Sequence, residues 1–298
     1  MLDALQRLVT RFENNPTLLD PHHLRQRLEA LDRLDAHLTF AFSAASPSDS
    51  IEPELYRRAT AICARLEAAN AELYSAIRRE IRRTFRPDAL LRWVSLSGDI
   101  SPQASEVVPI PANGMGYDHL DDLLSGVLQL EEPSAVPTAP DQEMVSYQPT
   151  PARHIFHLLC VTELSAADVL VDLGSGLGHV PLLVAICTQA RCIGVEREAA
   201  YIERARQCAN RLNLNHVTFL KRDVREADLS AGTVFYLYTP FLGSILDAVL
   251  DRLRREATTR PICICSYGPI TPVIAQEHWL QAASAPLTDR ITLFRSRE

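Results

Sequence analysis

The first 97 residues contain no glycine, and their apolar residues recur at a spacing of three to four positions, as in the series from Leu24 to Leu38. This periodicity is typical of amphipathic helices. Asp20 followed by Pro21 is a typical helix start, with a capping side chain before a proline in the first turn. The pattern predicts an all-helical N-terminal domain over residues 1–97, with helices at 3–14, 21–42 and 52–84.

The pattern changes from about Tyr147 onward, where short β-rich runs alternate with amphipathic helical segments. Strands that alternate with helices are typical of a doubly wound parallel sheet. We therefore predict a Rossmann-like α/β domain over residues 146–298. Its strands are expected at 168–173, 191–195, 216–220, 233–238 and 261–267.

The stretch between these two regions is acidic and rich in proline. Residues 101–150 carry eight acidic side chains, seven prolines and no Lys or Arg, whereas residues 1–100 are neutral and residues 151–298 carry +1. The net charge of −7 therefore comes from this stretch. We predict a linker over residues 98–145 with one short helix at 116–128.

Composition narrows the class of protein. With 298 residues, of which 47% are hydrophobic, the chain is long enough for two domains with buried cores. No apolar run has the length of a membrane span, and the N-terminus carries charges where a signal peptide is apolar. We therefore expect a soluble, cytoplasmic protein with no membrane partner. The negative charge disfavours a strongly basic nucleic-acid binder.

Metal and redox chemistry have little support. The seven cysteines are scattered, without a CxxC pair or a His/Cys cluster at zinc spacing, and are typical of reduced, buried thiols. His154 and His157 lie one helical turn apart but have no acidic or cysteine partner. We predict no metal site.

A glycine-rich turn follows the first predicted strand. Gly174, Gly176 and Gly178 alternate with other residues, and Asp172 precedes them at the strand end. Closely spaced glycines allow a tight turn whose backbone approaches a ligand. The dinucleotide fingerprint GxGxxG would place its third glycine where His179 stands, so the spacing differs from that of nicotinamide-binding proteins.

Two acidic residues follow the next two strands. Glu196 lies 24 residues after Asp172, where an acid accepts ribose hydroxyls, and Asp223 follows the third strand. Together with the D-x-G-x-G-x-G motif, they resemble class I S-adenosylmethionine (SAM) dependent methyltransferases. The resemblance implies SAM as cofactor, with Asp172, Gly174, Ser175, Gly176 and Gly178 at the methionine end, Glu196 at the ribose and Asp223 at the adenine. It also implies a seven-strand methyltransferase sheet whose last strands come from 278–284 and 291–297.

A second motif is similar to one subset of that family. Tyr147-Gln148-Pro149-Thr150-Pro151 leads into an apolar helix, as in the disruptor-of-telomeric-silencing histone lysine methyltransferases and the relatives of the ATP synthase c-subunit lysine methyltransferase. The similarity spans about residues 144–270. It implies that Gln148 and Thr150 lie at the methionine end of SAM, and that the acceptor is a protein lysine amine.

The end of the fourth strand departs from a related pattern. Enzymes that methylate adenine N6 or a glutamine amide carry Asn/Asp-Pro-Pro-aromatic there, whereas this chain has Tyr238-Thr239-Pro240-Phe241. Those two acceptors are therefore disfavoured. For an amine acceptor, Tyr147 and Tyr238 are the candidate catalytic residues, because a tyrosine beside the methyl group can desolvate the amine and aid its deprotonation.

Other functions remain open on sequence grounds. The acceptor could instead be a small molecule or RNA, and the chain could be a non-catalytic SAM-binding scaffold whose helical domain carries the function. A nicotinamide-dependent oxidoreductase would use the same fold, although the early third glycine argues against it. Because the methyltransferase core is generic, we expect substrate selection to lie in the N-terminal domain and linker.

Overall fold

The structure is a computed structural model, which describes residues 2–43, 52–83, 88–96, 116–133, 145 and 147–297. Much of the predicted linker over residues 98–145 lies outside the described residues. The chain divides into two compact units: Met1–Glu80 with Arg92–Val108, and Ile81–Leu91 with Pro109–Glu298. Each unit is described by itself.

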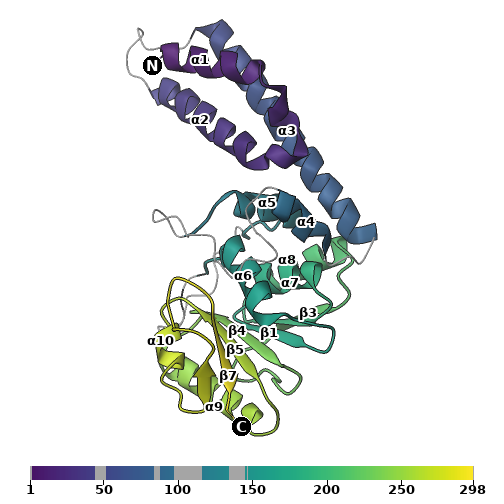
Figure 1. Cartoon of the computed structure of the whole chain (residues 1–298), viewed down its shortest axis with the longest axis vertical. Coiled ribbons are helices and arrows are strands. Elements are labelled where there is room, and N and C mark those ends of the chain that lie inside the picture. The colour runs from purple at the N-terminus through teal and green to yellow at the C-terminus, as the bar shows by residue number, and fades with distance from the viewer. Residues whose placement is uncertain are drawn as a thin grey trace. The chain divides into compact units, whose positions relative to one another are not determined.

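The first unit is helical, as the apolar periodicity predicted. Its elements are α1 (Leu2–Glu13), η1 (Pro16–Leu19), η2 (Pro21–His23), α2 (Leu24–Ser43), α3 (Pro53–Arg83) and α4 (Asp88–Leu96), of which α3 and α4 extend into the second unit (Figure 1). Leucines of α1 and α2 pack with α3 in one buried cluster that includes Leu5, Leu34 and Ile62. Asp20 accepts a hydrogen bond from the backbone N–H of His22 (2.9 Å), so it caps the 3-10 turn η2, and α2 begins three residues later than expected.

The second unit is built around a seven-stranded sheet, which confirms the predicted fold class. The strands are β1 (Val169–Leu173), β2 (Arg191–Glu196), β3 (Val217–Lys221), β4 (Val234–Tyr238), β5 (Cys263–Tyr267), β6 (Leu280–Ala282) and β7 (Thr292–Ser296). Their order is β3-β2-β1-β4-β5-β7-β6, with β1 to β5 parallel and β7 antiparallel to its two neighbours. Successive strands are added on one side of β1 up to β3 and on its other side from β4 onward. Doubly wound sheets leave a crevice for ligands at such a change of strand order, here between β1 and β4.

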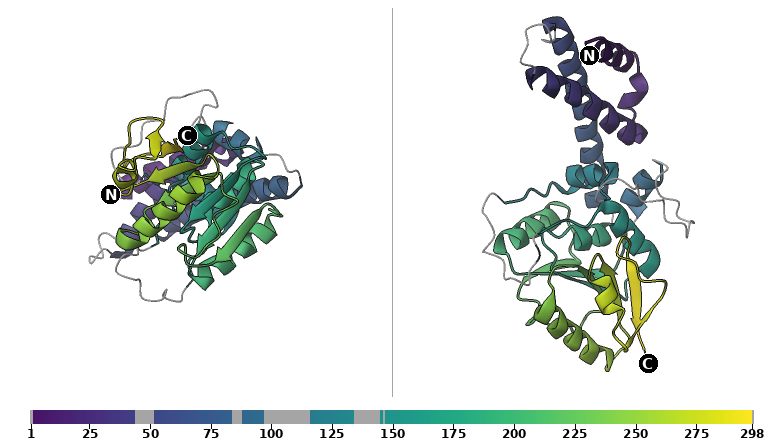
Figure 2. Two further views of the ribbon diagram at one scale, coloured as in Figure 1. Left: turned by 90° about the horizontal axis from the view of Figure 1, so that it is seen from below. Right: turned by 90° about the vertical axis from the view of Figure 1, so that its left-hand side faces the viewer.

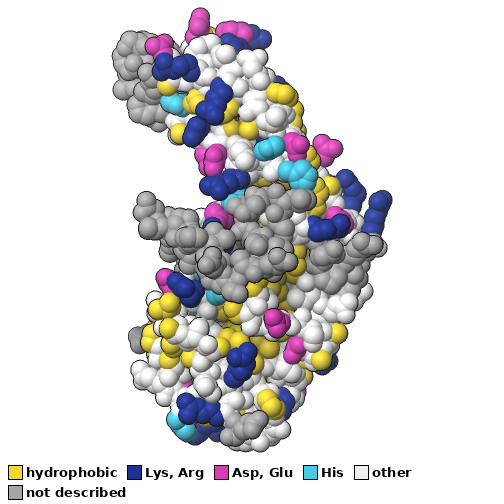
Figure 3. All heavy atoms as spheres, in the orientation of Figure 1, with side chains coloured by type: hydrophobic (Ala, Val, Ile, Leu, Met, Phe, Trp, Pro, Cys, Tyr) yellow, Lys and Arg dark blue, Asp and Glu magenta, His cyan; other side chains and the backbone are white. Residues whose placement is uncertain are grey.

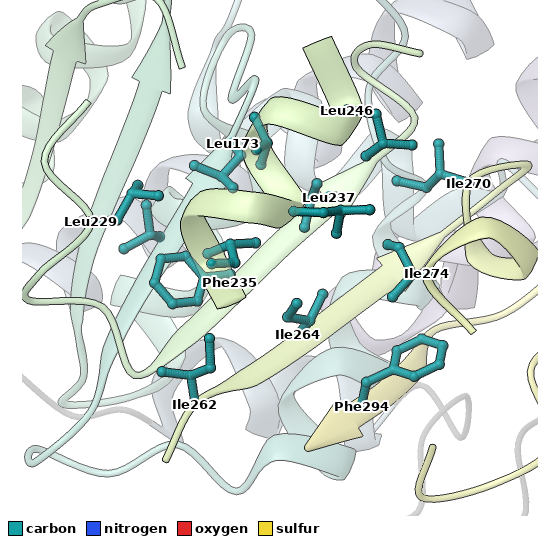
Figure 4. Packing of buried hydrophobic residues seen from close by; sticks show 14 of the residues in the cluster. Leu173, Leu229, Phe235, Leu237, Leu246, Ile262, Ile264, Ile270, Ile274 and Phe294 are labelled. Carbon is teal, nitrogen blue, oxygen red and sulfur yellow. The ribbon is translucent and has the colours of Figure 1, made fainter. Parts of the chain in front are cut away.

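Helices cover both faces of this sheet (Figure 2). They are α7 (His179–Cys187), α8 (Ala199–Arg211), α9 (Gly243–Ala257) and the short α10 (Thr271–Ile274). Apolar residues of α9, including Leu246, pack with Leu173, Leu237 and Ile264 of the sheet (Figure 4). Because both faces are covered, every residue of β1 is buried, which explains its nearly continuous apolar sequence.

Two helices that precede the sheet belong to the same unit. They are α5 (His119–Leu128), within the predicted helical segment, and α6 (Ala152–Thr162). Asp121 joins them, because its carboxylate accepts the N–H groups of Asp118 (2.7 Å) and of Ala152 (2.8 Å), at the start of each helix. At the other end of α5, the carbonyl oxygen of Leu128 accepts from the Cys208 thiol of α8 (3.2 Å). The helix of the acidic segment is thus packed against this α/β unit. Among the described residues, no helix has the length and apolar character needed to cross a membrane.

Candidate active site

A cavity of about 590 Å³ opens at the carboxyl ends of β1 to β4. It is lined by residues that follow each strand, including Gly174 after β1, Arg197 after β2 and Thr239 after β4. Of the residues selected from the sequence, Gly176 and Gly178 lie in the same turn but do not line the cavity. The others line it: Tyr147, Gln148, Thr150, Asp172, Gly174, Ser175, Glu196, Asp223 and Tyr238.

The turn after β1 leaves no room for side chains. Gly174 and Gly176 have φ values of +90° and +50°, in the left-handed region that glycine adopts without strain. A Cβ atom on Gly176 would lie 2.1 Å from the ring of Tyr147. The N–H groups of Gly174 and Ser175 both donate to the carbonyl oxygen of Val195 (2.9 and 3.0 Å), which fixes the turn to β2.

Glu196, the expected ribose ligand, holds this turn from β2. Its Oε2 accepts the N–H of Gly176 (2.9 Å), and its Oε1 accepts the N–H groups of Arg197 (2.6 Å) and Glu198 (2.9 Å). Since each carboxylate oxygen has two lone pairs, the contacts among the described residues leave one acceptor position, on Oε2. The sequence spacing did not show that Glu196 also orders the glycine turn.

Asp223, the expected adenine residue, is paired with Arg225. Its Oδ1 accepts from the backbone N and the Nε of Arg225 (2.9 Å each), and its Oδ2 accepts from a terminal guanidinium nitrogen (2.7 Å). These bonds hold the pKa of Asp223 below its usual range. The pair places an arginine, unforeseen from the sequence, at the β3 end of the cavity.

Asp172 is buried at the end of β1, where it pairs with Gly194 of β2 and Tyr236 of β4. Burial raises the pKa of Asp172 well above its usual value, and the negative charge of Glu196 raises it further. A cation in the cavity would favour the ionised form. The Oγ of Ser175 is buried against Gly194 of β2 and has no hydrogen-bond partner among the described residues.

Tyr147 packs on the glycine turn and contacts residues in the first turns of two helices. Its hydroxyl lies 3.0 Å from Nδ1 of His179 in α7, and its ring centroid lies 5.0 Å from that of Tyr201 in α8. Burial lowers the pKa of His179 to about 4 and raises the pKa of the Tyr147 hydroxyl. At neutral pH the phenol is therefore protonated and donates to a neutral imidazole.

Further hydrogen bonds attach the segment around Tyr147 to β4. The backbone N–H of Val145 donates to the carbonyl oxygen of Pro240 (3.3 Å), and Oγ1 of Thr150 lies 2.9 Å from the hydroxyl of Tyr236. Gln148, in the same segment, forms a side-chain hydrogen bond with Tyr117. This segment therefore forms a wall of the cavity.

At the end of β4, Tyr238 belongs to an aromatic stack. Its ring centroid lies 4.6 Å from that of Tyr267, which in turn lies 4.2 Å from that of His154. Burial raises the pKa of Tyr238, and its hydroxyl has no hydrogen-bond partner among the described residues. The next residue, Thr239, has a φ of +42°, which is rare for a β-branched residue. Such strain is concentrated at functional sites.

Besides Arg225, four other residues of this site or its immediate surroundings were not selected from the sequence. His179 directly follows the glycine motif, but nothing in the sequence indicated its hydrogen bond with Tyr147. Tyr201, Tyr236 and Tyr267 had no signal beyond being aromatic residues in helical or strand patterns. Among the described residues, no group of His, Cys, Asp and Glu side chains is arranged to hold a metal ion.

Residues 164–271, which include the glycine turn and the ends of β1 to β5, match the protein-family model described as a methyltransferase domain. The chain contains a methyltransferase domain. The cofactor of this domain is SAM, and the residues present fit it, since Glu196 lines the cavity and its carboxylate keeps one acceptor position for a ribose hydroxyl.

Several solved structures are similar to about half of the chain. An RNA methyltransferase from Salinibacter ruber in complex with S-adenosylhomocysteine (SAH) is 26% identical over 50% of this chain and 92% of its own, with a TM-score of 0.39. A tRNA (uracil-54, C5)-methyltransferase from Pyrococcus abyssi is 19% identical over 50% of this chain and 39% of its own, with a TM-score of 0.39. A precorrin-6y C5,15-methyltransferase from Geobacter metallireducens is 16% identical over 52% and 95%, with a TM-score of 0.40. None of the curated proteins matches the chain.

Proposed function

We propose that the methyltransferase domain transfers the methyl group of SAM to a lysine amine of a protein. The observation that carries this proposal is the end of the cavity at β4, where the Tyr238 hydroxyl has no partner among the described residues. The resemblance of the segment 147–151 to protein lysine methyltransferases supports the same acceptor. The proposal gives Asp172, Ser175, Glu196 and Asp223 to the cofactor, and Tyr238 to the acceptor.

SAM supplies a methyl carbon on a sulfonium, so the nitrogen lone pair displaces sulfur in line and the electrons of the broken C–S bond stay on sulfur. The task of the protein is to align the amine and to exclude water. Tyr238, Pro240 and Phe241 line the cavity at the acceptor end. A protonated Tyr238 hydroxyl can accept an N–H of the amine and so direct the nitrogen lone pair inward.

A lysine must lose a proton before it can attack. No acidic, basic or histidine side chain lies among the residues 238–246 that follow β4, and both candidate tyrosines have pKa values raised by burial. A tyrosinate base is therefore disfavoured at neutral pH. Desolvation lowers the pKa of an ammonium group, so in this proposal the apolar wall favours the neutral amine, and the proton passes to water at the entrance.

Single-turnover transfer of tritium-labelled methyl from SAM into a cell extract tests the proposed acceptor. Separate aliquots are digested with protease and with nuclease. Release of label by the protease alone, with methyl-lysine in the hydrolysate, is expected. Release of label by the nuclease would contradict the lysine acceptor and indicate an RNA acceptor. Label in neither polymer, with binding of SAH intact, would point to a small molecule or to a scaffold without activity.

A further inference from the structure

Most of the chain at the β4–β5 side of the carboxyl edge is uncharged, and the charged pair Asp289 and Arg290, whose charges act on Tyr267 and His154, follows the last of these segments. Four uncharged segments belong to this side: residue 145 with 147–152, and residues 238–246, 262–276 and 279–288. None of them contains Asp, Glu, Lys or Arg, in a chain in which 22% of residues are charged. Residues 196–198 and 221–226, which follow β2 and β3, contain a single uncharged residue, Val224. The β2–β3 half of the carboxyl edge is therefore highly charged, whereas the β4–β5 half is mostly uncharged.

The uncharged side also exposes large apolar side chains. Six described large hydrophobic residues are exposed, and all except Leu19 belong to the second unit. We call these five, each between 40% and 43% exposed, the apolar rim: Tyr117, Val145, Leu242, Val273 and Leu287. On the face drawn in Figure 3, hydrophobic side chains gather around α10, the helix that contains Val273.

Three members of the apolar rim lie beside the cavity, at its β4 end or at the segment that follows Tyr147. Val145 lines the cavity and donates to the carbonyl oxygen of Pro240 (3.3 Å). Leu242 follows Phe241, another lining residue. A third member, Tyr117, donates its hydroxyl to the carbonyl oxygen of Pro149 (2.5 Å), which also lines the cavity.

The remaining two members lie at the end of β5, the neighbour of β4 in the sheet. The N–H of Gly268 donates to the carbonyl oxygen of Thr288 (3.1 Å), which places Leu287 next to the lining residue Pro269. Val273 lies in the first helical turn after Pro269, with its N–H bonded to Ile270 (3.0 Å). The apolar rim therefore borders the acceptor end of the cavity.

The charge pattern selects one kind of partner. A nucleic acid needs Lys or Arg for its phosphates, and the four segments of this side provide neither. The next charged residues after Leu287 are Asp289 and Arg290, which pair with each other (3.4 Å). An apolar surface gains free energy by covering apolar groups. An acidic or phosphorylated partner would lose hydration there without compensation.

We propose that the apolar rim is the docking surface of the acceptor, and that the acceptor lysine lies in an apolar segment of a partner protein. This inference rests on the proposed function and specifies its substrate. The flanking apolar residues of the acceptor cover the rim, while the lysine side chain passes beside Tyr238 into the cavity.

The full chain and two pools of random peptides with a central lysine test this proposal. One pool has Leu, Val, Ile and Phe at the flanking positions, and the other has Ser, Asn, Asp and Glu. We expect label from tritiated SAM to enter the apolar pool with at least about tenfold higher kcat/KM. Leu242→Glu and Val273→Glu should each lower that value about tenfold, since each removes an apolar contact and adds an unpaired charge.

The control for these variants is Leu19→Glu, which changes an equally exposed leucine in the helical unit. It should leave methylation of the apolar pool unchanged. Calorimetric binding of SAH should be the same in wild type and all three variants. Equal or greater labelling of the polar pool, or unchanged kcat/KM in both rim variants, would overturn the docking surface.

The same experiment separates this inference from the function on which it rests. Absence of SAH binding in the wild-type chain would contradict the cofactor site itself. Binding of SAH with label in total RNA but in neither peptide pool would contradict both the lysine acceptor and the rim. Label in the polar pool alone would retain the lysine acceptor and refute only the apolar surface.

Discussion

The two halves of the carboxyl edge differ in how they hold a ligand. At β2 and β3, charged side chains bind one another and the backbone: Glu196 accepts three N–H groups, and Asp223 is paired with Arg225. At β4 and β5, aromatic rings stack and the segments are uncharged. The first half is built for a polar nucleoside whose hydrogen bonds are fixed in advance. The second half, in the proposed function, receives an acceptor amine that must lose its water and its proton.

The largest effect is expected from filling the turn between these halves. Gly176→Val should weaken SAH binding on the order of 100-fold, because it adds side-chain strain at a positive φ and a clash with the ring of Tyr147. Calorimetry gives the dissociation constant. Adding Tyr147→Ala to this variant should recover part of the loss by removing the ring. If Gly176→Val binds SAH normally, the turn is not the cofactor site.

The hydrogen bond between Tyr147 and His179 should affect the cofactor half. Tyr147→Phe and His179→Leu should each weaken SAH binding about fivefold, the value of one hydrogen bond. The double variant should lose little more than either single variant, because both remove the same bond. Fully additive losses in the calorimetric constants would show that the two side chains act independently.

Tyr238 should affect the acceptor half alone. Tyr238→Phe is expected to lower turnover about tenfold while the dissociation constant of SAH is unchanged, because the lost hydroxyl faces the acceptor. Tyr267→Phe is the matched control, since this ring stacks on Tyr238 but does not line the cavity. Full turnover on the true substrate in both Tyr147→Phe and Tyr238→Phe would refute a catalytic role for these tyrosines.

The smallest effect concerns Asp121, which joins α5 to α6 near the uncharged half. Burial raises the pKa of Asp121 to about 6, so protonation is favoured in the folded state. Its stabilising contribution is full below the unfolded-state value of 3.8 and is lost as the pH rises through about 6. Discounted for solvent screening, this amounts to about 1–2 kcal/mol. The free energy of unfolding, measured by urea titration from pH 4 to 7, should fall less steeply with pH in Asp121→Asn than in wild type. The same pH dependence of the unfolding free energy in wild type and Asp121→Asn would contradict a raised pKa of Asp121.

Much of this fold followed from periodicity. Three long helices of the first unit and the first five strands lie within a few residues of the ranges that the pattern predicted, because a buried stripe or strand must be apolar along its length. The last two strands lie within the ranges that the family resemblance implied. The exceptions are local. The predicted helix start at residue 21 is a 3-10 turn, because Asp20 bonds to the N–H of His22 two residues later. α4 was not expected, although it buries Leu90 and Val94.

Spacing also determined which residues would lie together around the cavity, because the ends of parallel strands must meet at one edge. The glycine turn and the acids after β1, β2 and β3 could therefore be selected from the sequence. Only the tertiary structure decided which hydrogen-bond and packing partners these side chains have. The bond from Tyr147 to His179 and the bond from Val145 to Pro240 depend on contacts between distant segments. A one-dimensional pattern records which face of an element is buried, but the partner that covers it is fixed by packing.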